Sequence, residues 1–137
     1  MHHCREKEIV RTDHAPKAIG PYSVGVKASH FVFTAGQIGL IPETGAIITG
    51  GVEAETRQAL TNVRAILEEA GTSLDQVVKT TVFLMDMNDF ARMNAVYGEF
   101  FTANPPARSA VQVAGLPKGA LVEIEAVALV PCEGHHE

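Results

Sequence analysis

The last third of the chain alternates between apolar and polar residues in a way that predicts two β-strands. Two apolar, β-branched runs flank a Leu-Pro-Lys-Gly turn at residues 116–119, and a short connection of this kind joins strands. One face of the second run is wholly apolar, whereas the other carries Glu123 and Glu125 among large aliphatic residues. Because a buried carboxylate is costly unless it is paired, the mixed face predicts a pocket or a subunit interface.

Two helices are predicted upstream of this region. Apolar residues recur at helical spacing over residues 52–70 and 89–101, and Gly71 stands where a helix-ending glycine belongs. Further strands are predicted at residues 9–11, 23–28, 31–38 and 77–85. This order predicts a single α+β domain in which the two long helices shield one face of a sheet. With no third helix for the other face, we expect copies of the chain to bury it in a homo-oligomer.

Composition and charge narrow the class of protein. The chain has 137 residues, of which 46% are hydrophobic and 20% charged, which is typical of one globular domain without a membrane span. A net charge of -5 with scattered lysines and arginines argues against a nucleic-acid partner. Without a signal-peptide core, the cytoplasm is the expected location.

The ends of the chain are predicted to be flexible tails, at residues 1–8 and 131–137. Cys4 and Cys132 form no disulfide framework and fit a reducing compartment. A soft metal site is conceivable if the termini meet, built from His2, His3, Cys4, Cys132, His135 and His136. We favour disordered tails over a metal site.

Arg108 and Glu123 are the first candidates for chemistry. The planar fork of arginine suits a carboxylate held by two hydrogen bonds. A carboxylate on a rigid strand, at Glu123 or Glu125, can orient or deprotonate a water molecule. The alternative carries equal weight: one glutamate forms a structural ion pair with Arg108 and the other faces water.

Three further residues have both a functional and a structural interpretation. Tyr22 follows a Gly-Pro turn and could reach a ligand, although a half-buried packing role is favoured. Gly36, inside a predicted strand, marks a close approach of backbone or ligand; beside it Gln37 is either a polar contact or part of a bulge. Asn94 falls within the apolar stripe of the second helix, and a hydrogen-bonded core position is slightly favoured over a pocket position.

Several short motifs together resemble the RidA/YjgF family of reactive intermediate deaminases. They are Ala18-Ile19-Gly20-Pro21-Tyr22-Ser23, Ala35-Gly36-Gln37-Ile38-Gly39, Val78-Lys79-Thr80-Thr81-Val82, Asn88-Asp89-Phe90, Pro106-Ala107-Arg108-Ser109, Leu116-Pro117-Lys118-Gly119 and Ile124-Glu125-Ala126-Val127-Ala128. The likeness runs from about residue 9 to residue 129 in unbroken order.

The resemblance implies a bacillus-type chorismate-mutase-like fold and a homotrimer with clefts between subunits. It also implies cofactor-free, metal-free hydrolysis of 2-imino acids, such as 2-iminobutanoate and 2-iminopropanoate, to 2-oxo acids and ammonia. The carboxylate-binding arginine of the family falls on Arg108 and its water-positioning glutamate on Glu123. Its pocket tyrosine and asparagine fall on Tyr22 and Asn94. Two positions of backbone contact fall on Gly36 and Ala110.

Two departures from the family pattern bear on the substrate. Many members have serine where this chain has Ala35, and cysteine where it has Ala110. Alanine at position 110 excludes a cysteine nucleophile there but preserves main-chain contacts. We therefore expect substrate preference, rather than reaction type, to differ.

Two alternative functions stay open. Members of the family have been described as endoribonucleases and translation inhibitors, but the acidic balance and the lack of a histidine pair argue against that role; His14 and His30 look like loop histidines. The other alternative is a non-catalytic, ligand-binding trimer, which would be marked by loss of Arg108, and that arginine is present.

Overall fold

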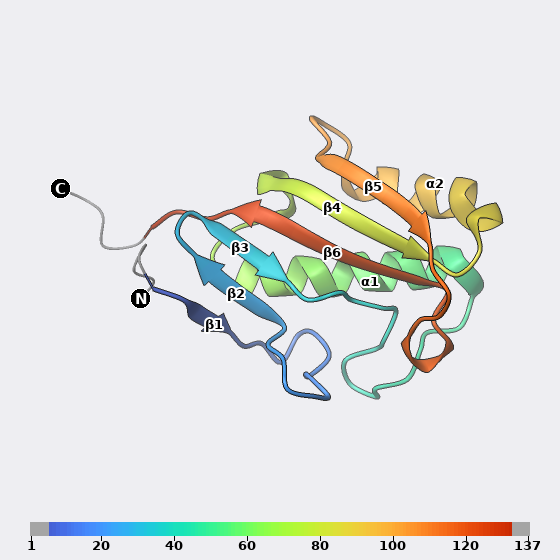
Figure 1. Ribbon diagram of the computed structural model, residues 1–137, viewed down its shortest axis with the longest axis horizontal. Helices are drawn as coiled ribbons and strands as arrows, with labels where there is room; N and C mark the ends of the chain where they lie inside the picture. The colour runs from blue at the N-terminus through green and yellow to red at the C-terminus, as the bar shows by residue number, and fades with distance from the viewer. Residues whose placement is uncertain (1–5, 133–137) are drawn as a thin grey trace.

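A six-stranded mixed sheet with two long helices on one side forms the molecule (Figure 1). The computed structural model describes residues 6–132. Its strands are β1 (Glu8–Val10), β2 (Gly25–Ala28), β3 (Phe31–Thr34), β4 (Val77–Leu84), β5 (Ala107–Gln112) and β6 (Val122–Leu129), and its helices are α1 (Gly51–Glu69) and α2 (Phe90–Phe100). The predicted α+β class with two helices on one face is confirmed.

The strands lie in the order β1-β2-β3-β6-β4-β5. All neighbours are antiparallel except β4 and β5, which are parallel and connected through α2. The two runs around the Leu-Pro-Lys-Gly turn are therefore strands, as predicted, but they are not neighbours in the sheet. Strand β4 lies between them and separates β5, at the sheet edge, from the glutamates of β6.

Helix α1 covers the centre of the sheet because its apolar residues recur on one side. Ala59, Leu60, Val63, Ile66 and Leu67 are completely buried. The helix starts after Gly50 and is followed by Gly71, both with positive φ, at 124° and 93°. Only glycine takes such angles readily, so the sequence sets both boundaries. Measured against the predicted range of 52–70, the helix differs by one residue at each end.

Strand β6 shows the predicted alternation. Its residues Val122, Ile124, Ala126 and Ala128 are buried under the helices, whereas Glu123, Glu125 and Val127 are half-buried on the opposite face. That open face also exposes Phe31, Phe33 and Leu129, with Phe31 directly opposite Leu129 in the ladder. A contiguous apolar patch of this kind is unusual on a protein that stays monomeric.

The end of β3 contains an irregularity that the sequence indicated at Gln37. The strand stops at Thr34, yet Gln37 again exchanges backbone hydrogen bonds with Ile124, at 2.8 and 2.9 Å. The antiparallel register is shifted by one residue between the two stretches. This corresponds to the bulge interpretation of Gln37.

The two ends of the described chain differ in part from expectation. Strand β1 begins at Glu8, inside the range predicted as a tail. Cys132 is disulfide-bonded, so the expectation of reduced thiols is wrong for this residue; the chain's other cysteine, Cys4, lies outside the described residues. Among residues 6–132, no three His, Cys, Asp or Glu side chains gather as metal ligands; the tail residues His2, His3, His135 and His136 lie outside this range.

None of the described helices combines the length and the apolar composition of a membrane span.

Candidate functional site

Arg108 lies on a shelf formed by one side of α2. Its guanidinium carbon is 4.7 Å from the ring centre of Tyr97 and 5.4 Å from that of Phe90. Its Nη1 donates a hydrogen bond of 2.5 Å to Oδ1 of Asn94. Phe90, Asn94 and Tyr97 recur at helical spacing, which brings all three under the same side chain. The arginine is thus oriented by contacts within one chain.

The guanidinium keeps donors available for a ligand. Arginine has five N–H groups, and within residues 6–132 the only hydrogen bond of this side chain is the one to Asn94. No carboxylate of the described chain forms an ion pair with it. The alternative in which a glutamate of β6 pairs with Arg108 is therefore wrong within a single chain.

A buried hydrogen bond holds Tyr97, one of the residues that form the shelf, in place. The hydroxyl groups of Thr80 and Tyr97 share a hydrogen bond of 2.7 Å, and Thr80 lies beside Arg108 in the β4–β5 ladder. Burial raises the pKa of Tyr97, while Thr80 and Arg108 act in the opposite direction. The Tyr97 ring therefore remains a neutral platform at ordinary pH.

Asn94 is a surface residue, and the slightly favoured core interpretation is wrong. Its side chain is exposed, and its partner is Arg108. The apolar stripe of α2 passes beside Asn94 to Met93, Val96 and Tyr97, which are the buried residues of the helix. The helix lies against the outer strands of the sheet, so a residue at the margin of the stripe meets the edge strand β5 and not the core.

Glu123 lines a small pocket of about 70 Å³ on the open side of the sheet. Residues from four separate segments surround it: Lys17, Tyr22, Gly36, Gln37, Lys118 and Glu123. Tyr22 is 49% exposed, so the favoured packing role is wrong; its hydroxyl accepts a hydrogen bond of 3.3 Å from the backbone N–H of Ile19, which closes the Gly-Pro turn. The pocket thus collects the predicted residues Tyr22, Gly36 and Glu123.

Gly36 is needed for the close approach predicted from the sequence. A Cβ atom at this position would lie 2.7 Å from Oε2 of Glu123 and 2.8 Å from its Cδ. Real side chains do not come so close, so the carboxylate of Glu123 would have to move. The prediction of close approach at Gly36 is confirmed, and the group that approaches is the candidate catalytic carboxylate.

Glu123 has the electrostatics of a proton acceptor. Burial raises its pKa above the ordinary glutamate value, and the like charge of Glu125 raises it further. A raised pKa brings a carboxylate closer to the range in which it accepts protons efficiently at neutral pH. Lys17 and Lys118 also line the pocket, and sequence reasoning assigned them no role. The sequence did contain a signal for Lys118, because this residue belongs to the turn that precedes β6, the strand of Glu123.

The Arg108 shelf and the Glu123 pocket lie on opposite faces of the same sheet. Arg108 points toward α2, on the helical side, whereas Glu123 alternates with Val122 and Ile124 and so faces the open side. Ala110, half-buried in β5 against the margin of the core, belongs to the arginine side. Ala35 lies beside the pocket, where its N–H donates to the carbonyl of Val24 at 2.8 Å. Within one chain, the Arg108 shelf and the Glu123 pocket therefore do not meet.

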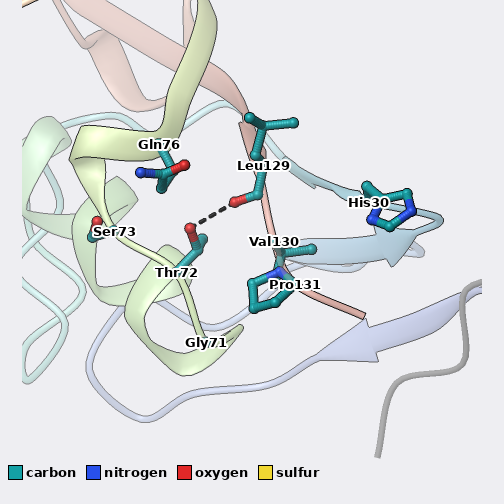
Figure 2. A pocket seen from close by; sticks show the side chains of 8 residues that line it. All are labelled: His30, Gly71, Thr72, Ser73, Gln76, Leu129, Val130 and Pro131. Atoms are coloured by element: carbon teal, nitrogen blue, oxygen red, sulfur yellow. Dashed lines mark hydrogen bonds between the residues drawn. The ribbon is translucent and has the colours of Figure 1, made fainter. Parts of the chain in front are cut away.

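A much wider pocket, of about 690 Å³, lies at another place and contains none of the predicted site residues. Figure 2 shows the segment after α1, with Thr72, Ser73 and Gln76, beside the end of β6, where the Thr72 hydroxyl donates to the carbonyl of Leu129 at 2.6 Å. His30 is the one ionisable side chain among its lining residues. Because no second ionisable side chain of residues 6–132 lines it, this pocket offers fewer groups for acid–base chemistry than the Glu123 pocket, despite its size.

Comparisons with known proteins agree on one family. Residues 12–130 match the sequence model of the family described as Endoribonuclease L-PSP. A RutC family protein of Pyrococcus horikoshii is 57% identical over 122 residues, which are 89% of this chain and 97% of that protein. The human 2-iminobutanoate/2-iminopropanoate deaminase is 49% identical over 123 residues, which are 90% of each chain.

Solved structures give the same result for the fold. The structure of Escherichia coli TdcF with bound serine has a TM-score of 0.87 and 48% sequence identity, covering 90% of this chain and 99% of that one. The product of the E. coli YjgF gene, solved at 1.2 Å, has a TM-score of 0.86 and 50% identity, covering 89% and 98%.

Proposed function

The chain belongs to the RidA/YjgF family, whose family model carries the description Endoribonuclease L-PSP, and from this premise we propose that it hydrolyses reactive 2-imino acids to 2-oxo acids and ammonia. Mammalian relatives with about half of their residues identical are named 2-iminobutanoate/2-iminopropanoate deaminase. Those two imines, small acids with a carboxylate beside the C=N bond, are the proposed substrates.

The observation that supports this proposal most is the state of Arg108. Its guanidinium is oriented by Asn94 and two rings, yet within the described chain it has no anionic partner. A positioned, unpaired arginine matches the planar carboxylate of a 2-imino acid, which it can hold by two parallel hydrogen bonds. This binding fixes the imine carbon relative to other groups of the site.

The complete site requires a second copy of the chain. Arg108 and Glu123 face opposite sides of the sheet, and the open face carries the apolar patch of Phe31, Phe33 and Leu129. We propose that burial of this patch against another copy places the Glu123 pocket of one chain beside the edge strand β5 of its neighbour. We propose a homotrimer of the chorismate-mutase-like type, with three such clefts.

The proposed reaction uses a water molecule and no electron transfer. Glu123 accepts a proton from water while the water oxygen attacks the imine carbon, and the C=N bond becomes a C–N single bond. That proton passes from Glu123 to the nitrogen, which gives a carbinolamine with an OH and an NH2 group on the same carbon. The hydroxyl proton then moves to the nitrogen, again through Glu123, as the C–N bond breaks with release of ammonia and the oxygen forms the C=O group of the 2-oxo acid. Tyr22, at the mouth of the pocket, is positioned to contact the substrate. The proposed reaction transfers no electrons and its nucleophile is water, so it requires neither a redox cofactor nor a cysteine at position 110.

The ribonuclease function suggested by the family description has less support in this chain. Neither His14 nor His30 lines the Glu123 pocket or contacts Arg108. The net charge of -5 also opposes the binding of a phosphate backbone. A ribonuclease assay at several salt concentrations distinguishes the two functions, since true phosphate binding weakens steeply with salt.

The direct test couples the purified protein to a threonine dehydratase and follows release of 2-oxobutanoate. We expect Arg108→Ala to lower kcat/KM by roughly 10²- to 10⁴-fold, the loss of a bidentate charged contact. Arg92→Ala, which removes an exposed arginine of α2 that pairs with Asp89, is the matched control and should retain activity. Full activity of Arg108→Ala with an unchanged melting temperature would remove the arginine from the mechanism.

A further inference from the structure

Helix α1 carries a row of polar side chains that faces the inside of the molecule, although its sequence pattern predicts only an amphipathic helix that covers the sheet. Glu55, Gln58 and Asn62 are three and four residues apart and therefore share one side of the helix. Glu55 is 5% exposed and Asn62 is completely buried. Buried polar side chains are almost always hydrogen-bonded, so their partners indicate their purpose.

Asn62 holds the segment that follows Gly36. Its Nδ2 donates to the backbone carbonyls of Ile38 and Leu40, at 3.2 and 2.9 Å. Its Oδ1 accepts a hydrogen bond of 2.9 Å from Nε2 of Gln58, which fixes the orientation of the amide. The chain leaves the sheet at this point, and Asn62 supplies the donors that a neighbouring strand would otherwise provide.

Glu55 holds the segment that leads to Glu123. Its Oε1 accepts a hydrogen bond of 2.8 Å from the backbone N–H of Leu121. Backbone hydrogen bonds of β6 alternate between its two neighbours: Ile124 bonds to Gln37 on one side, and on the other side the carbonyl of Leu121 accepts from the N–H of Met85, just beyond β4, at 3.1 Å. The N–H of Leu121 belongs to that second side, where the carboxylate of Glu55 accepts its hydrogen bond in place of a backbone carbonyl.

We propose that Glu55 and Asn62 are positioning residues for the deaminase reaction, acting from the closed face of the sheet on the carboxylate of Glu123 on the open face. Gly36 is two residues before Ile38, which Asn62 holds, and Glu123 is two residues after Leu121, which Glu55 holds. The contact between Gly36 and Glu123 leaves no room for a methyl group, so a small shift of either segment changes where the carboxylate points. This inference rests on the proposed function, because it assigns the two residues to that reaction.

Steady-state kinetics of Glu55→Ala separate positioning from a merely structural role. The anchor acts on Glu123 and not on Arg108, so we expect kcat to fall about 10- to 100-fold while KM changes less than about threefold. Glu55→Gln should recover kcat to within about threefold, because its amide oxygen can still accept from Leu121. Arg57→Ala is the matched control on the same helix: it loses an exposed ion pair with Glu99 and should keep its kcat.

Asn62→Ala provides an independent variant should Glu55→Ala fail to fold, with the same expected fall in kcat. Unchanged kcat in a folded Glu55→Ala or Asn62→Ala, or an equal fall in Arg57→Ala, would overturn the proposal.

A readout that needs no activity keeps this inference separable from the proposed function. In Glu55→Ala, the amide protons of Gln37 and Ile124 should exchange with solvent at least about tenfold faster, while that of Val82, in β4, keeps its rate. If the wild-type protein lacks deaminase activity but these two amides exchange faster in Glu55→Ala, the proposed function is wrong, whereas the anchoring of the two segments is supported. Unaltered exchange at Gln37 and Ile124 would refute the anchors themselves.

Discussion

Arg108 and Glu123 occupy opposite faces of one sheet, and different kinds of contact hold them in place. Arg108 is oriented by side chains of a single helix, through two rings and the amide of Asn94. Glu123 is confined by backbone, since Gly36 approaches it too closely for any side chain to fit. The arginine side therefore depends on which residues α2 carries, whereas the glutamate side depends on how the β3 and β6 segments are held in register.

The largest effect should follow from Glu123→Gln, which removes the proton acceptor and retains the shape of the pocket. We expect kcat to fall roughly 10²- to 10⁴-fold, the usual contribution of a general base. KM should change little, because in the proposed site Arg108 holds the substrate carboxylate. Coupled assays measure both constants. Activity close to wild type would mean that the raised pKa of Glu123 has no part in catalysis.

Mixing two inactive variants tests whether the Arg108 shelf and the Glu123 pocket of one site come from different copies. Arg108→Ala and Glu123→Ala, unfolded together and refolded, should form sites in which an intact arginine meets an intact glutamate. Random assembly makes about a quarter of the sites competent, so activity should return to about a quarter of wild type. Each variant refolded alone is the control. No recovery in assembled, mixed oligomers would show that each site belongs to one chain.

Gly36→Ala should disturb only the glutamate half. Its Cβ would meet the Glu123 carboxylate at 2.7 Å, and we expect kcat to fall about 10- to 100-fold through misplacement of that group. Gly115→Ala is the matched control, because a Cβ there meets nothing within 4 Å. Binding of a 2-oxo acid product, measured by calorimetry, should weaken less than kcat falls. Equal activity of the two variants would contradict the close-approach argument.

The smallest effect concerns stability. Burial and Glu125 raise the pKa of Glu123 in the folded protein, so the folded state binds a proton more tightly than the unfolded state. Stability is then lost as the pH rises from the ordinary glutamate pKa through the folded value. Glu123→Gln should be more stable than wild type at pH 8, and the difference should vanish as the pH falls below 4. Urea unfolding at both pH values measures it; a variant less stable at pH 8 would contradict the sign.

Local patterns predicted the elements of this fold well. The spacing of apolar residues located α1 and α2 to within a residue or so, and the glycines beside α1 fixed its ends. Alternation in β6 predicted which of its residues face the core, and Gly36 correctly marked a close approach. These signals succeed because each depends on backbone conformation over a few residues.

Predictions about single polar residues were less successful. Asn94 was placed in the core, and Tyr22 was given a packing role, yet both are exposed in the structure. A residue at the edge of a helix's apolar stripe faces either the core or solvent, depending on which neighbouring element packs there. The sequence pattern of the helix itself gives no information about that neighbour. Glu55 and Asn62 were missed for a related reason: their partners are backbone groups 22 to 66 positions away in sequence.

The sequence by itself determined the α+β class, the two helices, the face of β6 that enters the core, and the residue types suited to a carboxylate and a water molecule. Only the tertiary structure decided that β4 lies between β5 and β6 and that Arg108 and Glu123 face opposite ways. The physical reason is that periodicity is a local property of the chain. Strand order and register are set by contacts between distant segments, which become defined only when the whole core is buried.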